Sequence, residues 1–244
     1  MPISTYIKDR VRSFLQFLHL DITPNLRYDR LTLRIMQKVI QPTSNCIDVG
    51  CHKGEILEQI IKLAPKGKHS AFEPIPVYAE NLIKEFGDKV TIFPYALSNQ
   101  AGVSSFHFVR NAPAFSGIKQ RSYLIANPDI EKIDVELRRL DDLLQADLPI
   151  HFMKIDVEGG EFDVLKGAVR TLKTYKPIVI FESGLGASER YGTKPETLFQ
   201  FLREEVGLNV SLLKAFLNNE PSLSQSAFVR CFKESLEFYY IAHP

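Results

Sequence analysis

Short apolar runs alternate with segments of helical periodicity along most of the chain. Runs of four to seven apolar residues are typical of buried strands, whereas apolar residues at positions i, i+3, i+4 and i+7 are typical of helices. The predicted strands are residues 45–49, 68–73, 90–94, 151–157, 177–182, 208–213 and 237–242. The predicted helices are residues 54–64, 76–86, 195–206 and the segment that follows Gly159-Gly160. This alternation predicts an α/β fold with a doubly wound, Rossmann-like, mostly parallel sheet.

Two further helices are predicted before the first strand. Residues 4–20 place Ile7, Val11, Phe14, Leu15 and Leu18 on one face, and residues 28–40 form a second helix that ends before Pro42. We expect residues 1–40 to be a helical segment that packs on the core, with residues 41–244 forming the main domain. The face of the first helix could also join two copies of the chain in a homodimer.

A small β insert is predicted in the middle of the chain. Residues 104–109 and 133–139 alternate apolar and polar positions, which indicates two strands of an inserted or edge hairpin. The polar loop 111–121 between them is longer than a hairpin turn needs, and such loops often carry function. By contrast, the Ser-, Pro- and Asn-rich stretch 218–226 is predicted to be an ordinary loop.

Composition narrows the class of protein. The 244 residues are 45% hydrophobic and 24% charged with a net charge of +1, which is ordinary for a globular domain and disfavours nucleic acid as the partner. No apolar run reaches the ~18 residues of a membrane span, and charges interrupt the first 20 residues, so no signal peptide is predicted. The three cysteines form no Cys-x-x-Cys pair, which favours reduced thiols and a cytoplasmic location.

The segment 45–54 predicts a nucleotide-type cofactor cleft. An apolar strand runs into the turn Gly50-Cys51-His52-Lys53-Gly54, which opens a helix, and Glu73 closes the next strand, where it can accept hydrogen bonds from ribose hydroxyls. The turn lacks the middle glycine of an NAD fingerprint, and Asp48 would repel a pyrophosphate. A carboxylate at that position suits the cationic groups of S-adenosylmethionine (SAM), so the sequence favours SAM as the cofactor.

Acidic residues stand at the ends of four predicted strands. Ligands of open α/β sheets bind beyond the carboxyl ends of the strands, so these side chains should converge on one site. They are Asp48, Glu73, Asp156 with Glu158, and Glu182. The alternative role for Glu158 and Glu161 is stabilisation of the helix N-terminus that follows them.

Several motifs resemble the FkbM family of SAM-dependent methyltransferases. The most specific is the run Lys154-Ile155-Asp156-Val157-Glu158-Gly159-Gly160-Glu161. Ile47-Asp48-Val49-Gly50, Phe72-Glu73-Pro74, Ala96-Leu97-Ser98 and the strand that ends at Glu182 also fit, in the expected order over residues 28–185. The family often has Gly-Ala-Asn-x-Gly in the first turn, where this chain has Gly50-Cys51-His52-Lys53-Gly54.

The resemblance implies a class I methyltransferase fold and a role for each matching position. Asp48, Gly50 and Gly54 would hold the methionine part of SAM, with Cys51, His52 and Lys53 in the same turn. Glu73 would bind the ribose hydroxyls, and Pro74 would shape the turn beside them. Ala96, Leu97 and Ser98 would lie by the adenine, and Asp156 would lie at the methyl-transfer end of the cleft.

Transfer to a hydroxyl oxygen needs an aligned acceptor and a base, because an alcohol is a poor acid. The candidates for the base are Asp156, Glu158 and Glu182. Alternatively, Asp156 and Glu182 could bind Mg²⁺ and lower the pKa of the acceptor, but no tight ligand motif supports a metal and none is expected. In the loop 111–121, donors suited to a hydroxyl or a phosphate are offered by Asn111, Ser116 and Arg121.

The sequence therefore predicts an O-methyltransferase that acts on a hydroxyl of a sugar, a glycan or a related natural product. Two alternatives stay open at this point. One is a SAM-binding or protein-interaction module without catalysis, and the other is an NAD-dependent oxidoreductase, against which the missing middle glycine and Asp48 argue.

Overall fold

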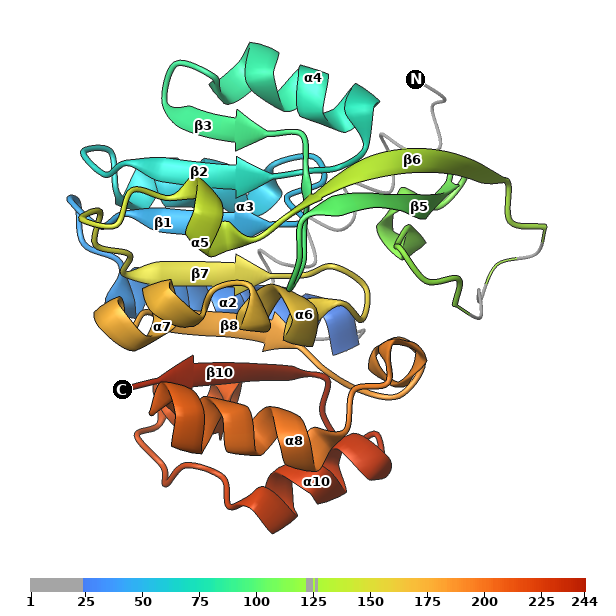
Figure 1. Ribbon diagram of the computed structural model, residues 1–244. Coiled ribbons are helices and arrows are strands. Elements are labelled where there is room, and N and C mark those ends of the chain that lie inside the picture. The colour runs from blue at the N-terminus through green and yellow to red at the C-terminus, as the bar shows by residue number, and fades with distance from the viewer. Residues whose placement is uncertain (1–23, 122–124, 126) are drawn as a thin grey trace.

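The computed structural model describes residues 24–121, 125 and 127–244. A seven-stranded sheet forms its centre, with the strand order β3-β2-β1-β7-β8-β10-β9 (Figure 1). Its strands are β1 (Cys46–Val49), β2 (His69–Phe72), β3 (Val90–Phe93), β7 (Phe152–Ile155), β8 (Ile178–Glu182), β9 (Asn209–Leu212) and β10 (Tyr239–His243). β10 runs antiparallel to both of its neighbours, β8 and β9, whereas the other pairs are parallel. The predicted doubly wound, mostly parallel α/β sheet is confirmed.

The two faces of the sheet are covered by separate sets of helices, because alternate strand residues point to opposite faces. One face carries Cys46, Phe152, Ile180 and Ile241, and its core includes α2 (Pro24–Val39), α3 (Glu55–Leu63) and α9 (Leu213–Leu217). Beside it, α4 (Pro76–Phe86) packs with α3 over β2. Nearly all strand positions of β1, β2 and β7 are buried, as expected for strands covered on both sides.

The second face packs against the elements that follow the β insert. Its core contains α5 (Leu140–Leu143), α6 (Glu161–Lys166), α7 (Val169–Tyr175), α8 (Pro195–Gln200) with the π-helical turn η3 (Phe201–Val206), and α10 (Gln225–Lys233). The helix predicted after Gly160 is divided into α6 and α7, because Gly167 and Ala168 interrupt it. A Cβ atom at Gly167 would overlap the carbonyl oxygen of Ser98, so the break keeps this helix close to the insert.

The inserted hairpin is confirmed and forms a sheet of its own. β5 (Gly102–Val109) pairs antiparallel with β6 (Ile130–Arg138), and the two-residue strand β4 (Ala96–Leu97) pairs with β6 on the other side. Figure 1 shows the hairpin projecting beyond the edge where the parallel strands end. The predicted loop 111–121 contains the short 3-10 helix η1 (Pro113–Phe115) and returns to β5 through a bridge between His107 and Gly117.

The sequence-based expectations for the N-terminal and C-terminal helices differ from the observed fold or lie outside it. The predicted helix at residues 4–20 lies outside the described residues, and with it the suggested dimer contact. The second predicted helix is α2, which starts at Pro24 and packs on the core, whereas the division of the chain at residue 40 stays a prediction. The helices α9 and α10 were not predicted, and α10 begins inside the stretch assigned to a loop, where the Ser224 hydroxyl caps it by accepting from the amide of Ala227 at 3.2 Å.

Candidate active site

The first turn of the site joins β1 to α3 by close backbone packing. Gly50 has φ 78°, and a Cβ atom there would overlap the carbonyl oxygen of Asp156 in the turn after β7. Gly54 has φ 83°, and a Cβ atom there would lie 2.7 Å from the ring of Phe86 on α4. Both glycines are thus needed for the turn to lie this close to its neighbours.

His52 and Lys53 form the tip of this turn. His52 has φ 49°, and its ring lies 4.8 Å from the ring of Tyr78, edge to face. Burial lowers the pKa of His52, and the neighbouring Lys53 lowers it further. Its Nε2 atom has no hydrogen-bond partner among the described residues, whereas Lys53 is exposed and Cys51 is buried against the carbonyl of Phe72.

Glu73 at the end of β2 locks two turns together. Its Oε2 accepts from the amide of His52 at 2.8 Å, and its Oε1 accepts from the amide of Ile75 at 2.9 Å, across the half-buried Pro74. Only 3% of Glu73 is exposed, and burial raises its pKa to about 7. Each carboxylate oxygen keeps a lone pair for a further donor.

Strand alternation brings Asp48, Lys154, Glu182 and Tyr239 to one face of the sheet, the face covered by α2. Asp48 pairs in register with Lys154, and Glu182 pairs in register with Tyr239. Asp48 is 2% exposed, its Oδ2 has no partner among the described residues, and burial raises its pKa to about 7. Burial alone would lower the pKa of Lys154, but the carboxylate of Asp156 keeps that pKa above its usual value.

Asp156 is the most strongly held acid of the site. Its Oδ2 accepts from Lys154 Nζ at 2.7 Å and from the Tyr239 hydroxyl at 2.8 Å. Burial opposes ionisation of Asp156, yet its pKa lies below its usual value because Lys154 and these donors stabilise the anion. Asp156 is therefore a fixed anion at neutral pH.

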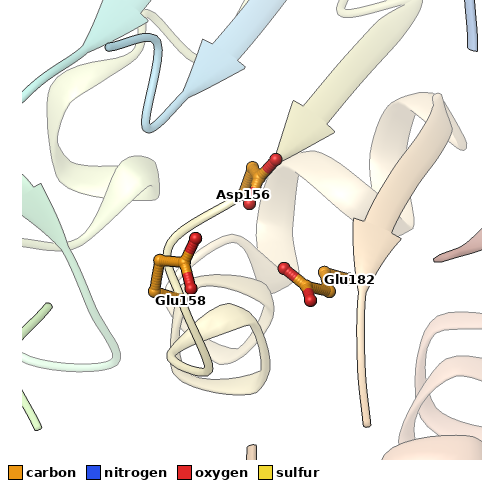
Figure 2. A group of neighbouring side chains, drawn as sticks. All are labelled: Asp156, Glu158 and Glu182. Carbon is orange, nitrogen blue, oxygen red and sulfur yellow. The ribbon is translucent and has the colours of Figure 1, made fainter. Parts of the chain in front are cut away.

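Glu182 and Glu158 lie beside Asp156 (Figure 2). One oxygen of each of the three carboxylates lies within 4.8 Å of the others. Burial, together with the charge of the neighbouring Asp156 carboxylate, raises the pKa of Glu182 to about 8. Glu158 forms an ion pair with Arg121 from the insert loop, in which each side chain is 18% exposed.

This spacing would admit one divalent cation, but two of the three carboxylates already have cationic partners. Arg121 neutralises Glu158, and Lys154 neutralises Asp156. An acidic cluster whose charges are compensated in this way gives no support to a metal. The expectation that the site needs no Mg²⁺ stays a prediction.

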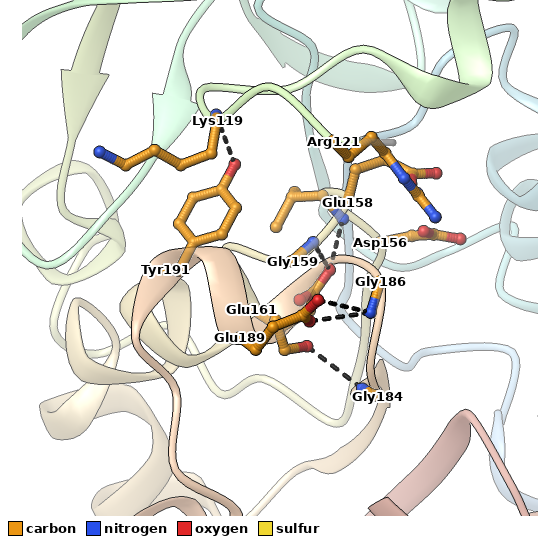
Figure 3. A network of polar contacts seen from close by, with 12 residues as sticks. Lys119, Arg121, Asp156, Glu158, Gly159, Glu161, Gly184, Gly186, Glu189 and Tyr191 are labelled. Atoms are coloured by element: carbon orange, nitrogen blue, oxygen red, sulfur yellow. Dashed lines mark hydrogen bonds and ion pairs between the residues drawn. The ribbon is translucent and has the colours of Figure 1, made fainter. Parts of the chain in front are cut away.

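Glu161 holds the turn that carries Asp156 and Glu158. Its Oε1 accepts from the amides of Val157 at 3.0 Å and Gly159 at 3.1 Å, so its carboxylate holds the turn before α6 and does not cap the helix itself (Figure 3). Its Oε2 has no partner among the described residues, and burial raises the pKa of Glu161 to about 7.

The insert loop is tied to this turn and to the segment after β8. The Tyr191 hydroxyl, from the 3-10 helix η2 (Ser188–Tyr191), accepts from the amide of Lys119 at 3.1 Å (Figure 3). A Cβ atom at Gly159 would lie 2.7 Å from the backbone of Ala187 and 2.9 Å from the Tyr191 ring. Three loops therefore meet over the acids, and together they form one wall of the site.

The predicted substrate residues occupy different positions in this wall. Arg121 reaches the acids, and its guanidinium lies 5.3 Å from the centre of the Phe115 ring. Asn111 instead bonds to the backbone of Asn127 and Asp129, and the Ser116 hydroxyl accepts from the amide of Val109. Of the three residues, Arg121 is thus the one that the fold brings to Asp156 and Glu182.

Ala96, Leu97 and Ser98 lie on and directly after β4, between the insert and the second face of the sheet. All three are buried, and the amide of Ser98 donates to the carbonyl of Arg138 at 2.9 Å. Leu97 belongs to the same apolar cluster as Phe72 and Phe93, whose rings stack at 4.9 Å. This segment therefore packs beside the end of β2, which Glu73 follows directly.

Sequence reasoning gave no role to two residues of the site, Lys154 and Tyr239. Lys154 offered a signal, because a lysine inside a buried strand needs an anionic partner. Tyr239 offered none, because its position depends on the antiparallel entry of β10 beside β8.

Comparison with known proteins finds methyltransferases among the similar sequences and structures. A family model described as a methyltransferase FkbM domain matches residues 48–207. The methyltransferase sdnD of Sordaria araneosa is 28% identical over 152 residues, which cover 50% of this chain and 59% of that protein. The methyltransferase FkbM from Methylobacillus flagellatus KT superposes with a TM-score of 0.52 at 15% identity, over 92% of this chain and 52% of that chain.

The match spans 59% of the curated relative and 52% of the solved structure. At 15% identity the second similarity concerns the fold alone. Within the described part of the chain, no helix combines the length and apolar character that crossing a membrane requires.

Proposed function

Because the chain belongs to the FkbM family of SAM-dependent methyltransferases, we propose that it transfers the methyl group of SAM to a hydroxyl oxygen of a sugar, a glycan or a related natural product. The observation that carries this proposal is the pair of neighbouring acids Asp156 and Glu182, which lies at the carboxyl edge of the sheet beside the Gly50 turn. It supplies a base next to the place where open α/β sheets bind cofactors.

The cofactor would lie between the Gly50–Gly54 turn and Glu73. Both oxygens of Glu73 keep a lone pair for the ribose hydroxyls, and Asp48 presents an oxygen without a described partner to a cationic group. Ala96, Leu97 and Ser98 would border the adenine. SAM supplies an activated methyl group on a positively charged sulfur, which is a good leaving group.

The charge of the site favours a neutral methyl acceptor. Carboxylates outnumber cations around Asp156, and the cations Arg121 and Lys154 are already paired with acids. A phosphorylated or carboxylated acceptor would add a further negative charge to this site and would be repelled. A polyol such as a sugar can instead donate hydrogen bonds to the acids, so the phosphate considered for Arg121 is disfavoured.

Glu182 is the best candidate for the base among the three acids. Arg121 engages Glu158, and Asp156 is held ionised, whereas the pKa of Glu182 is about 8 and lies near the working pH of a general base. In the transfer, the hydroxyl proton passes to the ionised form of Glu182 while the oxygen attacks the methyl carbon. The carbon–sulfur bond breaks with both electrons left on sulfur, which gives S-adenosylhomocysteine (SAH).

The test combines binding and transfer on the same preparations. We expect calorimetry to show micromolar binding of SAH, its loss in Asp48→Ala, and no binding of NADH. Glu182→Gln should keep SAH affinity within about twofold but lose at least ~100-fold of transfer from SAM to a panel of neutral glycosides. The exposed Glu220→Gln serves as the matched control.

Three results would contradict the proposal. NADH binding without SAH binding would favour the oxidoreductase. SAH binding without transfer to any glycoside would favour the non-catalytic module. Transfer that is abolished by EDTA and restored by Mg²⁺ would replace Glu182 as base by a metal mechanism.

A further inference from the structure

Tyr239 brings a residue of the last strand into the candidate active site. It opens β10, outside the residues 48–207 that the family model matches, and its side chain faces the same side of the sheet as Glu182. Its hydroxyl donates to Asp156 Oδ2 at 2.8 Å, the same oxygen that accepts from Lys154 Nζ at 2.7 Å. One carboxylate oxygen thus holds two donors from two different strands.

Two neighbouring side chains pack against the ring of Tyr239. The ring of Tyr28 from α2 lies 4.9 Å away between centroids, and Lys154 Nζ lies 5.4 Å from the centre of the Tyr239 ring. The Tyr28 hydroxyl also donates to Glu237 and accepts from the amide of Phe238, the residue before Tyr239. These contacts leave the hydroxyl little freedom to point anywhere other than at Asp156.

Asp156 in turn lies beside Glu182, and one oxygen of each carboxylate lies within 4.8 Å of the other. We propose that Tyr239 is a positioning residue which, with Lys154, fixes Asp156 as a carboxylate, so that the proton taken from the acceptor stays on Glu182. This inference rests on the proposed function. It assigns different roles to the two adjacent acids. Asp156 stays ionised, and Glu182 carries the proton.

Two adjacent carboxyl groups share their protons, so the environment decides which of them keeps the last one. Lys154 and Tyr239 stabilise the charge on Asp156, and no comparable donor is present on Glu182 among the described residues. Other charged or titratable groups face this pair from every neighbouring element. They are Asp48 from β1, His52 from the turn after it, Arg121 from the insert loop, Glu158 from the turn after β7, and Glu161 from α6.

Removal of the Tyr239 hydroxyl has a defined consequence. Asp156 would lose one of its donors and become a stronger acceptor for the proton on Glu182. The pair of acids would then release its shared proton less readily, so the titration midpoint seen at Glu182 should rise by about one pH unit, the lower end of the scale for one hydrogen bond to a charged group.

The experiment measures this midpoint without relying on turnover. Glutamate carboxyl carbons are labelled with ¹³C, and the NMR titration of the full chain is recorded from pH 5 to pH 10. Glu182→Gln identifies the Glu182 signal by its disappearance. The titration is repeated for Tyr239→Phe and for the matched control Tyr240→Phe, which removes a buried hydroxyl from the same strand on the opposite face, where it donates to the carbonyl of Glu237.

We expect the Glu182 midpoint to rise in Tyr239→Phe and to stay unchanged in Tyr240→Phe. An unchanged midpoint in Tyr239→Phe overturns the inference, and so does an equal rise in both variants, which would indicate general loosening of the strand. In an active preparation, the acid limb of the kcat profile should move in the same direction, with KM for SAM within about twofold. Absence of any methyl transfer would contradict the proposed function and leave the NMR result on Tyr239 intact.

Discussion

At the scale of single residues, buried acids dominate the chemistry of this protein. Glu161 is the clearest case of a buried acid that is only partly hydrogen-bonded. One of its oxygens accepts from two backbone amides, while the other has no described partner. A carboxylate that is 1% exposed and lacks a cation of its own resists ionisation. Burial also opposes the ionisation of Asp48 and Glu73, and a cationic ligand beside them would favour their charged forms.

Glu161→Gln tests the cost of burying the Glu161 charge, through the pH dependence of the free energy of unfolding. Burial raises the Glu161 pKa from its usual 4.5 to about 7, so its contribution to stability is complete below pH 4.5 and is lost as the pH rises through 7. The difference corresponds to at most about 3 kcal/mol. Thermal melts should therefore show similar stability of the two proteins at pH 5 and a variant that is more stable at pH 9.

The amide of the variant can still accept from Val157 and Gly159, which keeps the turn intact. Glu189→Gln is the control, because Glu189 is an exposed carboxylate in the neighbouring helix η2. If Glu161→Gln increased thermal stability equally at pH 5 and pH 9, burial of the Glu161 charge would not be the cause of the increase.

At the scale of elements, the β insert matters because its loop reaches back to the sheet. β5 and β6 form the insert, but the loop between them is held by Arg121 on Glu158 and by the Lys119 amide on Tyr191. These contacts link the insert to the turns after β7 and β8. The insert thus builds the wall of a site whose floor is the edge of the main sheet.

Tyr191→Phe tests this link while preserving the ring that packs on Gly159. Loss of one hydrogen bond, about 1 kcal/mol, should speed amide hydrogen exchange of residues 116–121 by about fivefold and leave the strands of the main sheet unchanged. Tyr175→Phe is the matched control, since its hydroxyl bonds to the carbonyl of Ala146 away from the insert. Equal exchange of residues 116–121 in Tyr191→Phe and the wild type would mean that the loop is held by other contacts.

The elements predicted correctly from the sequence are those whose structure depends on residues close together in the chain. The glycines of the first turn, the acids at the ends of buried strands and the alternating strands of the insert could all be recognised from neighbouring residues. The sequence pattern did not reveal the strand β4, with two residues, or the short helices α9 and α10, because their formation depends on packing against distant elements. Tyr239 belongs to the same class, since only the pairing of β10 with β8 brings it to Asp156.

At the scale of the whole molecule, the fold concentrates negative charge in one place although the net charge is only +1. Strands from both halves of the chain deliver Asp48, Glu73, Asp156 and Glu182 to the same edge, where Lys154 is the buried cation. SAM carries one more positive charge than SAH, at its sulfur. The charge of the site should therefore distinguish these two ligands, which are otherwise nearly identical in shape.

This distinction should depend on pH in a direction that the acids determine. The pKa values of Asp48 and Glu73 are both raised to about 7 by burial, so these groups gain negative charge between pH 6 and pH 8.5. Attraction to the sulfonium grows over that interval, and the Kd of SAH divided by the Kd of SAM should rise about three- to tenfold. Calorimetry with both ligands, at several pH values and low salt, measures this ratio.

Two controls separate the charge of the site from other effects of pH. The ammonium and carboxylate of the methionine part are common to both ligands, so their titration cancels in the ratio. Asp48→Asn should flatten the rise, because it removes one of the two titrating acids, and high salt should weaken it by screening. A ratio that stays constant from pH 6 to pH 8.5 in the wild type would mean that the sulfonium does not face these acids, and the cofactor would then have to lie elsewhere along the edge of the sheet.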